Sequence, residues 1–411
     1  MAKISKQSPK LALTLSGGGA RGAYEAGVMH YIRTQLPKEA RERGFNIHTG
    51  ASIGAINACF LASTAHDLAC QGNAMIQLWK SVNQNTVYQR NLPAFLSLLG
   101  YSLRGILANF VLGVKHNSAH FKGLLNTSPL PNYLQANIDF KAIAHNVAQG
   151  IVDAIALVGT NVVSGRTELF VHKSPSIQYS GSYQLREGPI RCEQVMASSA
   201  IPLIFPPVLV DGIPYIDGGL RLNTPLSPAI QLGADKILVL SLHHQWMEPV
   251  LQPLPTVMPT MGQILGRVMN TIFLDRTEWD VEQLTRINRI IEWSEQHYGA
   301  DFLSVINETI QASGARGDIA DRGLKKLQLL KIEPSYDIGQ LYQEHFEQNI
   351  RQSHFTMMER FLIRLLDIDP ESGFDLLSYI TFMPGYIKLL LELGYEDGRR
   401  HHDALVSFML E

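Results

Sequence analysis

Over its first 242 residues the chain alternates short apolar runs with longer stretches of amphipathic spacing. The short runs predict strands at residues 10–16, 46–49, 151–163, 167–172, 208–210, 215–216 and 236–242. Apolar positions at helical spacing predict helices at 23–36, 52–64, 68–82, 189–199 and 225–233. This alternation predicts an α/β fold, with a mostly parallel central sheet flanked by helices in three layers. We expect this core to span residues 8–245.

The pattern changes beyond residue 245. Four prolines between residues 249 and 259 indicate a flexible connection. Helical periodicity then dominates at 261–296, 300–312 and 337–410, whereas residues 326–332 (KLQLLKI) predict one strand that returns to the core sheet. Residues 246–411 are therefore expected to form a largely helical C-terminal extension.

Residues 92–114 form the most hydrophobic segment that we expect at the surface. The segment is long enough to cross a bilayer, but Arg104 at its middle, with Ser97, Ser102 and Asn109, argues against a membrane span. Two interpretations stay open. The segment is either a pair of helices that covers the core, or a lid or membrane-docking face near an active site.

Composition narrows the class of protein. The 411 residues are 45% hydrophobic and 18% charged, which suffices for a large buried core. A net charge of -2 gives no reason to expect a nucleic-acid partner. The three cysteines have no paired spacing, and the N-terminus lacks a signal-peptide core. We therefore expect a cytoplasmic protein, peripheral at a membrane if residues 92–114 dock there.

A candidate nucleophile follows the strand at 46–49. Gly50, Ser52 and Gly54 spell G-x-S-x-G, the pattern of a serine on a strained turn between a strand and a helix. The glycines let strand and helix approach closely, and the helix dipole beside Ser52 would stabilise an alkoxide that forms on an acyl substrate. Alone, this short motif equally describes a plain Gly-Ser turn that begins a helix.

A second candidate motif, GGGARG, follows the first predicted strand at residues 17–22 and opens the helix at 23–36. Such a loop binds anions through its backbone N–H groups and the helix dipole. The anion is either a dinucleotide pyrophosphate or the oxyanion of an acyl-transfer intermediate. Glu39 and Glu42 lie in a charged run before the second strand, not at its end, where a dinucleotide site needs its acid. The oxyanion interpretation is therefore favoured.

A third turn carries an acid. Asp217, Gly218 and Gly219 follow the strand at 215–216. Loops that follow the strands of a parallel sheet gather along one edge, where ligands bind. We therefore expect an anion hole, an exposed serine and a carboxylate to meet in one pocket.

Together these motifs resemble the three signatures of the patatin-like phospholipases, in the family's order. The stretches ASSAIP at 197–202 and FPP at 205–207 resemble the family's sequence before the Asp-Gly-Gly turn. The resemblance covers about residues 10–242. Less specifically, residues 375–398 are similar to the extension of bacterial members.

The resemblance implies a Ser–Asp dyad, with Ser52 as nucleophile and Asp217 as base. Gly17, Gly18 and Gly19 would supply oxyanion donors, and the geometry of the turn adds the Ile53 N–H. A free aspartate is a weak base at neutral pH, and burial is the effect that would strengthen Asp217.

Two further sets of residues are open to more than one role. Arg21 would lie near the oxyanion hole, either to favour an anionic head group or as a structural cation. His243 and His244 follow the strand at 236–242, where a Ser…Asp…His triad would place its histidine. Their simpler interpretation is a polar strand end.

We therefore expect a serine lipid acyl hydrolase of the phospholipase A or lysophospholipase type. A soluble carboxylesterase or transacylase is the nearer alternative, and a non-catalytic binding or scaffolding protein is the more distant one. No cofactor is expected. No metal site is expected either, because the Asp and His residues lack ligand spacing. The partner would be a lipid or acyl ester, and the sequence leaves the oligomeric state open.

Overall fold

The computed structural model describes residues 9–90, 123, 125–202, 204–244, 276–313, 323–350 and 374–411. The apolar segment at 92–114 and the proline-rich connection at 249–259 lie outside these residues. The two interpretations of residues 92–114 therefore remain predictions.

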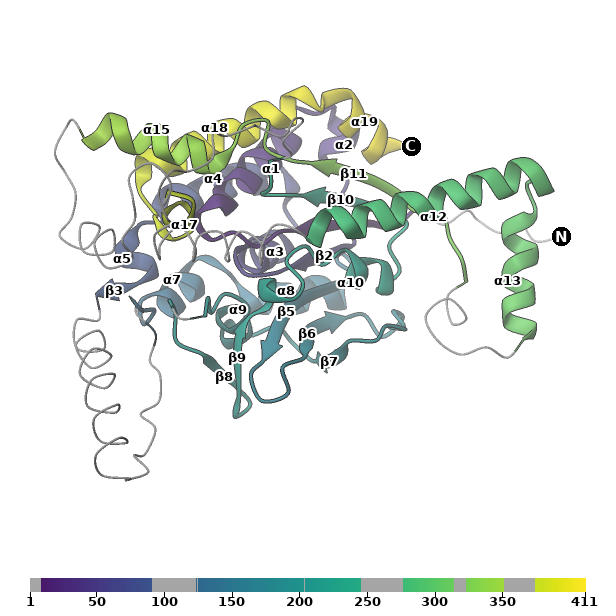
Figure 1. The fold of residues 1–411 in the computed structure, drawn as a ribbon, viewed down its shortest axis with the longest axis horizontal. Helices are drawn as coiled ribbons and strands as arrows, with labels where there is room; N and C mark the ends of the chain where they lie inside the picture. The colour runs from purple at the N-terminus through teal and green to yellow at the C-terminus, as the bar shows by residue number, and fades with distance from the viewer. Residues whose placement is uncertain are drawn as a thin grey trace, which may run out of the picture.

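Within the described residues, nine strands form one mixed sheet (Figure 1). Its main path runs β11-β10-β1-β2-β5-β6-β7, and β9 pairs with both β5 and β8. A separate short pair joins β3 (Gln89–Arg90) to β4 (Leu125–Asn126). The strands of the large sheet are β1 (Leu11–Leu15), β2 (Ile47–Gly50), β5 (Ala154–Asn161), β6 (Thr167–Lys173), β7 (Gln184–Glu187), β8 (Val208–Val210), β9 (Ile213–Asp217), β10 (Lys236–Leu240) and β11 (Gln328–Ile332).

The register of the parallel strands brings two predicted turns to the same level. Leu15 of β1 lies opposite Gly50 of β2, which lies opposite Leu157 of β5. The glycine-rich loop and the Ser52 turn therefore leave the sheet side by side. The five strands β11, β10, β1, β2 and β5 run parallel to one another, and the mostly parallel sheet that the sequence predicts is confirmed.

Helices cover both faces of the sheet and complete the predicted layers. They are α1 (Ala23–Gln35), α2 (Lys38–Arg41), α3 (Ile53–Ser63), α4 (Leu68–Ser81), α5 (Gln84–Val87), α7 (Leu130–Asn137), α8 (Phe140–Ala148), α9 (Cys192–Ser198), α10 (Leu226–Gln231), α12 (Arg276–Tyr298), α13 (Phe302–Ala312), α15 (Ile338–Ile350), α17 (Phe374–Ile380), α18 (Pro384–Arg400) and α19 (His402–Leu410). One apolar core joins α1, α3, α4 and the late helices to one face of the sheet. The other core packs α10 and part of α12 on the opposite face.

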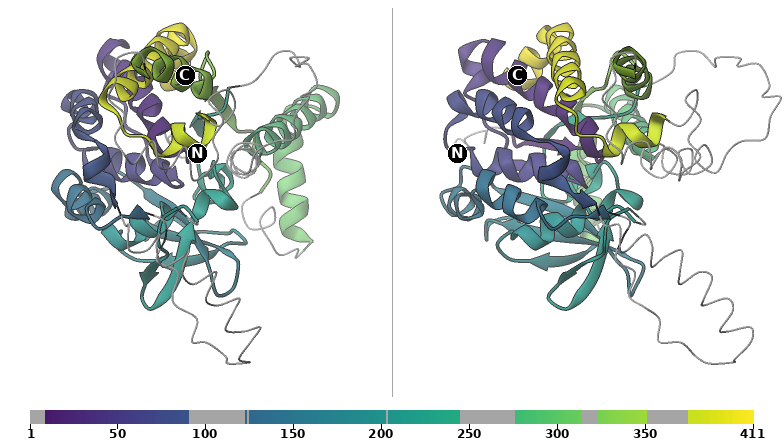
Figure 2. Two further views of the ribbon diagram at one scale, coloured as in Figure 1. Left: turned by 60° about the vertical axis from the view of Figure 1, so that its left-hand side comes forward. Right: turned by 90° about the vertical axis from the view of Figure 1, so that its left-hand side faces the viewer.

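The late part of the chain packs on the early part. β11 lies parallel to β10, and α18 lies along α1 (Figure 2). Two glycines allow this close approach, because a Cβ on Gly27 would overlap the Leu391 carbonyl and one on Gly394 would overlap the Tyr24 carbonyl. None of the described helices combines the length and the apolar content that a bilayer crossing needs.

The structure differs from the sequence-based expectation in some elements. The helix expected from Pro189 begins at Cys192 instead, and β7, α7 and α8 were not predicted. The larger difference concerns β9, which runs antiparallel to β5. Asp217 is therefore not carried by a further parallel strand, as the sequence argument assumed.

Candidate active site

The turn between β2 and α3 holds Ser52 in a strained backbone conformation. Its φ is 53° and its ψ is −124°, although it is not a glycine. A Cβ on Gly50 would overlap the Gly54 carbonyl, and one on Gly54 would overlap the Leu15 carbonyl. The two glycines of the motif are therefore required by the sharpness of the turn, as expected for a serine lifted off a sheet.

Two serines of α9 and its C-terminal end hold the backbone of this turn. The Ser52 N–H donates to Ser198 Oγ at 3.1 Å, and Ser199 Oγ donates to the Ser52 carbonyl at 3.0 Å. Both serines are buried. Their positions lie in the ASSAIP stretch, but sequence reasoning assigned them no role. These hydrogen bonds to the N–H and to the carbonyl of Ser52 help to maintain its strained backbone conformation.

Asp217 lies against the Ser52 hydroxyl. Ser52 Oγ donates to Asp217 Oδ2 at 2.6 Å, and the Gly219 N–H donates to Asp217 Oδ1 at 2.7 Å. Asp217 is fully buried. Burial raises the pKa of Asp217 from 3.8 to about 7, although the two hydrogen bonds oppose the rise. The carboxyl group is thus far more basic than a free aspartate.

The antiparallel strand β9 explains how Asp217 reaches this position. Asp217 is the last residue of β9 and pairs with Gly159 of β5, two residues beyond Leu157. Its main chain is also fixed, because Thr160 Oγ1 donates to the Asp217 carbonyl at 3.0 Å. β9 therefore runs into the pocket from outside the sheet edge, while the loops after β1 and β2 leave the sheet there.

The glycine-rich loop lies beside Ser52. Its first glycine is already engaged, because Gly17 N–H donates to the Asn223 carbonyl at 3.1 Å and Asn223 Nδ2 donates to the Gly17 carbonyl at 3.1 Å. No described residue accepts a hydrogen bond from the N–H groups of Gly18, Gly19 or Ile53. Of the four donors expected from the sequence, these three are free in the described structure.

Arg21 contacts the C-terminal part of the chain. It is buried, its Nε donates to Ser378 Oγ at 2.9 Å, and its guanidinium lies 3.9 Å from the Tyr379 ring centroid. The main chain of Tyr379 also packs against the glycine-rich loop, because its carbonyl oxygen lies where a Cβ on Gly19 would fall. The contacts favour the structural role of Arg21, and a role with an anionic head group remains a prediction.

The two histidines after β10 make other contacts. The ring of His244 pairs with the Pro334 carbonyl at 2.8 Å through Nδ1. The His243 N–H donates to Ser241 Oγ at 3.2 Å. The described partner of the Ser52 hydroxyl is Asp217, which favours a dyad over a histidine triad.

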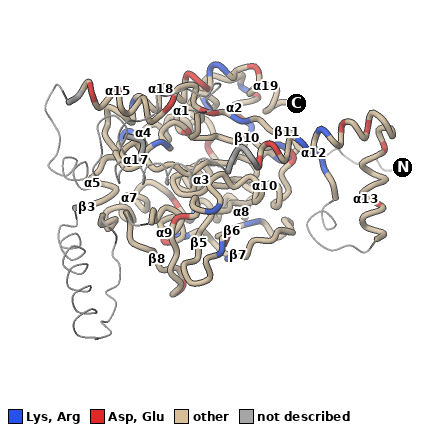
Figure 3. Tube along the Cα trace, viewed as in Figure 1, with Lys and Arg blue, Asp and Glu red and all other residues tan. Residues whose placement is uncertain are grey.

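An apolar cavity opens beside Ser52. Gly19, Ser52 and Ile53 form one part of its wall. The rest is mainly apolar and comes from distant segments: Ile56, Leu78, Trp79, Val82, Val87, Leu130, Tyr133, Leu134, Ser199, Ile201, Phe205, Tyr379 and Phe382. Two of the helices around it, α3 and α7, carry no Lys, Arg, Asp or Glu (Figure 3). The cavity suits a hydrocarbon chain better than a polar ligand.

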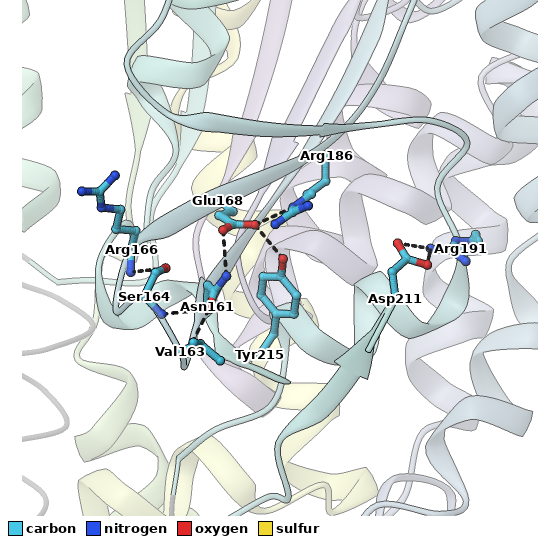
Figure 4. A network of polar contacts seen from close by, with 9 residues as sticks. All are labelled: Asn161, Val163, Ser164, Arg166, Glu168, Arg186, Arg191, Asp211 and Tyr215. Carbon is cyan, nitrogen blue, oxygen red and sulfur yellow. Dashed lines mark hydrogen bonds and ion pairs between the residues drawn. The ribbon is translucent and has the colours of Figure 1, made fainter. Parts of the chain in front are cut away.

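A second buried carboxyl lies on the neighbouring strand β6. Glu168 Oε2 accepts from Tyr215 at 2.6 Å and from Arg186 Nε at 2.8 Å, and Oε1 accepts from Asn161 at 2.8 Å (Figure 4). Tyr215 belongs to β9, two residues before Asp217. The Glu168 cluster, defined by these four residues, therefore fixes the strand that delivers Asp217. Among the described residues, no three His, Cys, Asp or Glu side chains gather where a metal ion could bind.

The family model of the patatin-like phospholipases matches residues 13–230, more than half of the chain. The chain belongs to the patatin-like phospholipase family.

Two relatives illustrate the similarity. The chain is 24% identical over 227 residues to the probable lipid hydrolase 463L of Invertebrate iridescent virus 6, covering 53% of this chain and 63% of that protein. It is 26% identical over 254 residues to an uncharacterized NTE family protein of Mycobacterium tuberculosis, covering 61% of this chain and 54% of that protein. The chain thus spans somewhat more than half the length of the relatives it matches.

The solved structures that the chain resembles include VipD from Legionella pneumophila and the ExoU–SpcU complex of Pseudomonas aeruginosa. VipD is 12% identical with a TM-score of 0.34, covering 97% of this chain and 67% of that one. ExoU–SpcU is 15% identical with a TM-score of 0.27, covering 90% of this chain and 69% of that one. These scores are too low to support an argument about function.

Proposed function

We propose that this protein is a serine lipid acyl hydrolase, of the phospholipase A or lysophospholipase type, which works through a Ser52–Asp217 dyad. The observation that carries the proposal is the 2.6 Å hydrogen bond from the Ser52 hydroxyl to a buried carboxyl of raised pKa, beside an apolar cavity. A serine hydroxyl becomes a useful nucleophile only when a base accepts its proton.

In the acylation step, Ser52 Oγ attacks the ester carbonyl carbon and its proton passes to Asp217 Oδ2. The carbonyl oxygen becomes an oxyanion, which the N–H groups of Gly18, Gly19 and Ile53 are available to stabilise. Asp217 then returns the proton to the leaving alcohol as the ester C–O bond breaks. The product is an acyl group bonded to Ser52.

In the deacylation step, Asp217 takes a proton from water, and the oxygen of that water attacks the acyl carbonyl. The same N–H groups would stabilise the second oxyanion. Collapse of this intermediate breaks the bond to Ser52 Oγ, which recovers the proton from Asp217. The fatty acid is released, and no cofactor enters either step.

The apolar lining supports a lipid over a polar ester as substrate. A soluble carboxylesterase or a transacylase uses the same chemistry, and the two differ from a lipase in substrate and acceptor. Hydrolysis that increases sharply when the substrate passes from monomers to micelles would support a lipid substrate. Efficient transfer to an added alcohol would support a transacylase.

The test is hydrolysis of a panel of phospholipid and lysophospholipid vesicles by wild type, Ser52→Ala and Asp217→Asn. Ser63→Ala is a matched control, because Ser63 is a buried serine at the far end of α3 whose hydroxyl donates to the Phe60 carbonyl. We expect fatty-acid release by wild type and Ser63→Ala, with none above background from the two dyad variants. Well-folded wild type that neither releases fatty acid nor reacts with a fluorophosphonate at Ser52 would favour the non-catalytic alternative.

A further inference from the structure

The glycine-rich loop is held at one end by the buried carboxyl of Glu25 and at the other by Asn57, which is itself bonded to that carboxyl. The N–H of Ser16, which precedes the loop, donates to Glu25 Oε1 at 2.8 Å. Asn57 Nδ2 donates both to Glu25 Oε2 at 2.8 Å and to the carbonyl of Gly22, the last loop residue, at 3.1 Å. Glu25 and Asn57 are both fully buried. The distance between the ends of the loop therefore depends on these two side chains.

The same amide connects the loop to the cavity wall. Trp79 Nε1 donates to Asn57 Oδ1 at 3.0 Å, and the Trp79 ring lines the cavity with Ser52 and Ile53. The ring also lies close to the loop, because a Cβ on Gly22 would come within 3.1 Å of Trp79 Cζ2. Trp79, which lines the apolar cavity, is thus hydrogen-bonded directly to Asn57, which anchors the loop.

The hydrogen-bond donors and acceptors of Asn57 and Glu25 permit a single arrangement of the bonds between them and the loop. The described bonds of Asn57 use both protons of its amide nitrogen and its amide oxygen, so the orientation of the amide is fixed. Glu25 must then offer two acceptors, which a carboxylate does and a glutamine does not. Burial raises the pKa of Glu25, and the hydrogen bonds from Asn57 and Ser16 oppose that rise.

We propose that Glu25 and Asn57 are positioning residues that hold the glycine-rich loop at the spacing an oxyanion requires, and that Trp79 makes this spacing respond to the acyl chain in the cavity. The inference rests on the proposed function, because it assigns the loop to oxyanion binding. It predicts that a long acyl chain increases kcat as well as affinity, since contact with Trp79 tightens the network behind the loop.

The first test compares Glu25→Gln with wild type on p-nitrophenyl butyrate and p-nitrophenyl decanoate. We expect kcat to fall between about 10-fold and 100-fold on both esters, with KM within about twofold, because displaced donors weaken only the transition state. Asp397→Asn is the matched control. It alters another fully buried carboxyl, which accepts from the Ser335 N–H and from the Tyr24 hydroxyl of α1 but has no described hydrogen bond to the glycine-rich loop. Its kcat should stay within about twofold of wild type even where its melting temperature falls.

The second test uses Trp79→Phe, which keeps an aromatic ring and removes only the donor. The ratio of kcat on decanoate to kcat on butyrate should fall by at least about fivefold. In an Asn57→Ala background the same substitution should leave this ratio unchanged, because the connection is already broken.

The outcomes separate the two proposals. If wild type hydrolyses neither ester, the proposed function fails. If wild type is active and Glu25→Gln keeps its kcat, the positioning role is wrong. If Trp79→Phe changes KM alone, or lowers the ratio equally in the Asn57→Ala background, the response to the acyl chain is wrong.

Discussion

Asp217 and Glu168 are two buried carboxyl groups in the same row of the sheet, yet they differ in charge behaviour. Both residues pair with Gly159, one from β9 and the other from β6. Glu168 accepts hydrogen bonds from Arg186, Tyr215 and Asn161, whereas Asp217 accepts them from a hydroxyl and a main-chain N–H. Both side chains are closed to solvent, but Asp217 lies deeper in the protein, and only Glu168 has a cation beside it.

The partners and the depth of burial together decide the pKa of each carboxyl group. Burial on its own raises the pKa of each group, but the Arg186, Tyr215 and Asn161 donors outweigh it at Glu168 and leave that pKa below its usual value. At Asp217 the two donors only moderate the effect of burial, and the pKa rises to about 7. A carboxyl becomes a base at neutral pH when the fold buries it without a cation. The Glu168 cluster shows what the same sheet does to a carboxyl that serves structure.

The sharpest way to break this comparison is Asp217→Asn. We expect kcat for ester hydrolysis to fall by about 1,000-fold or more, because no group is left to take the Ser52 proton. The free energy of unfolding should increase by about 1 to 3 kcal/mol at pH 8. Because the native pKa of Asp217 is raised, its contribution to stability is present below pH 3.8 and is lost as the pH rises through about 7. At pH 8 the native wild type therefore holds a buried charge, which asparagine removes.

Ester kinetics and urea denaturation on the same preparation check both parts. Retention of activity within tenfold of wild type would remove Asp217 from the mechanism.

The reciprocal substitution is Glu168→Gln. It should lower the free energy of unfolding by about 3 kcal/mol, because it weakens three hydrogen bonds to a buried group. The kcat of the folded fraction should stay within about twofold of wild type, since Glu168 does not touch the cavity. Urea denaturation at pH 7, with activity corrected for the folded fraction, measures the two effects separately. A large loss of kcat at normal stability would assign Glu168 a more direct part in catalysis.

Tyr215→Phe sharpens the comparison within the Glu168 cluster. It removes one hydrogen bond to a buried carboxylate and should cost about 2 kcal/mol of unfolding free energy. This cost should shrink as the pH falls, because a lowered native pKa makes the contribution of Glu168 present above its unfolded pKa and lost as the native carboxylate is protonated. Denaturation curves at pH 7 and at a series of pH values below 4.5, the usual pKa of a glutamate, test this. A cost that is the same at all of these pH values would show that the hydroxyl acts without regard to the charge of Glu168.

The pH dependence of catalysis is the most direct measure of the pKa of Asp217 in solution. The value of kcat/KM should rise about tenfold per pH unit and level off above about pH 7, as Asp217 loses its proton. Glu168→Gln should leave the midpoint in place, because Glu168 is already ionised over this range. A midpoint near pH 4 in wild type would mean that burial does not raise the pKa of Asp217 in solution.

The sequence predicted much of the framework because its signals were local. Buried parallel strands are continuous apolar runs, and the Ser52 turn needs glycines at fixed positions for steric reasons. The residues that hold the site were less visible. Ser198 and Ser199 support Ser52 from across the sheet edge, and Asn223 occupies the Gly17 N–H, through contacts that no local pattern encodes.

The direction of β9 was missed for a related reason. A short strand before an Asp-Gly-Gly turn reads the same whether it runs parallel or antiparallel to its neighbour. Likewise, the spacing of Glu25 and Asn57 does not predict a contact between them, since each lies inside a helix whose sequence is typical of a buried core helix. Asn57 follows Ser52 by little more than one helical turn, and this proximity was the one usable signal.

The order of synthesis has a consequence for this site. The glycine-rich loop and Ser52 leave the ribosome long before Tyr379 and Phe382, which wall the cavity. A nascent chain can therefore carry Ser52 and Asp217 while one side of the cavity is still missing. On the proposed function, competence for acyl release comes only after α17 and Phe382 have been made.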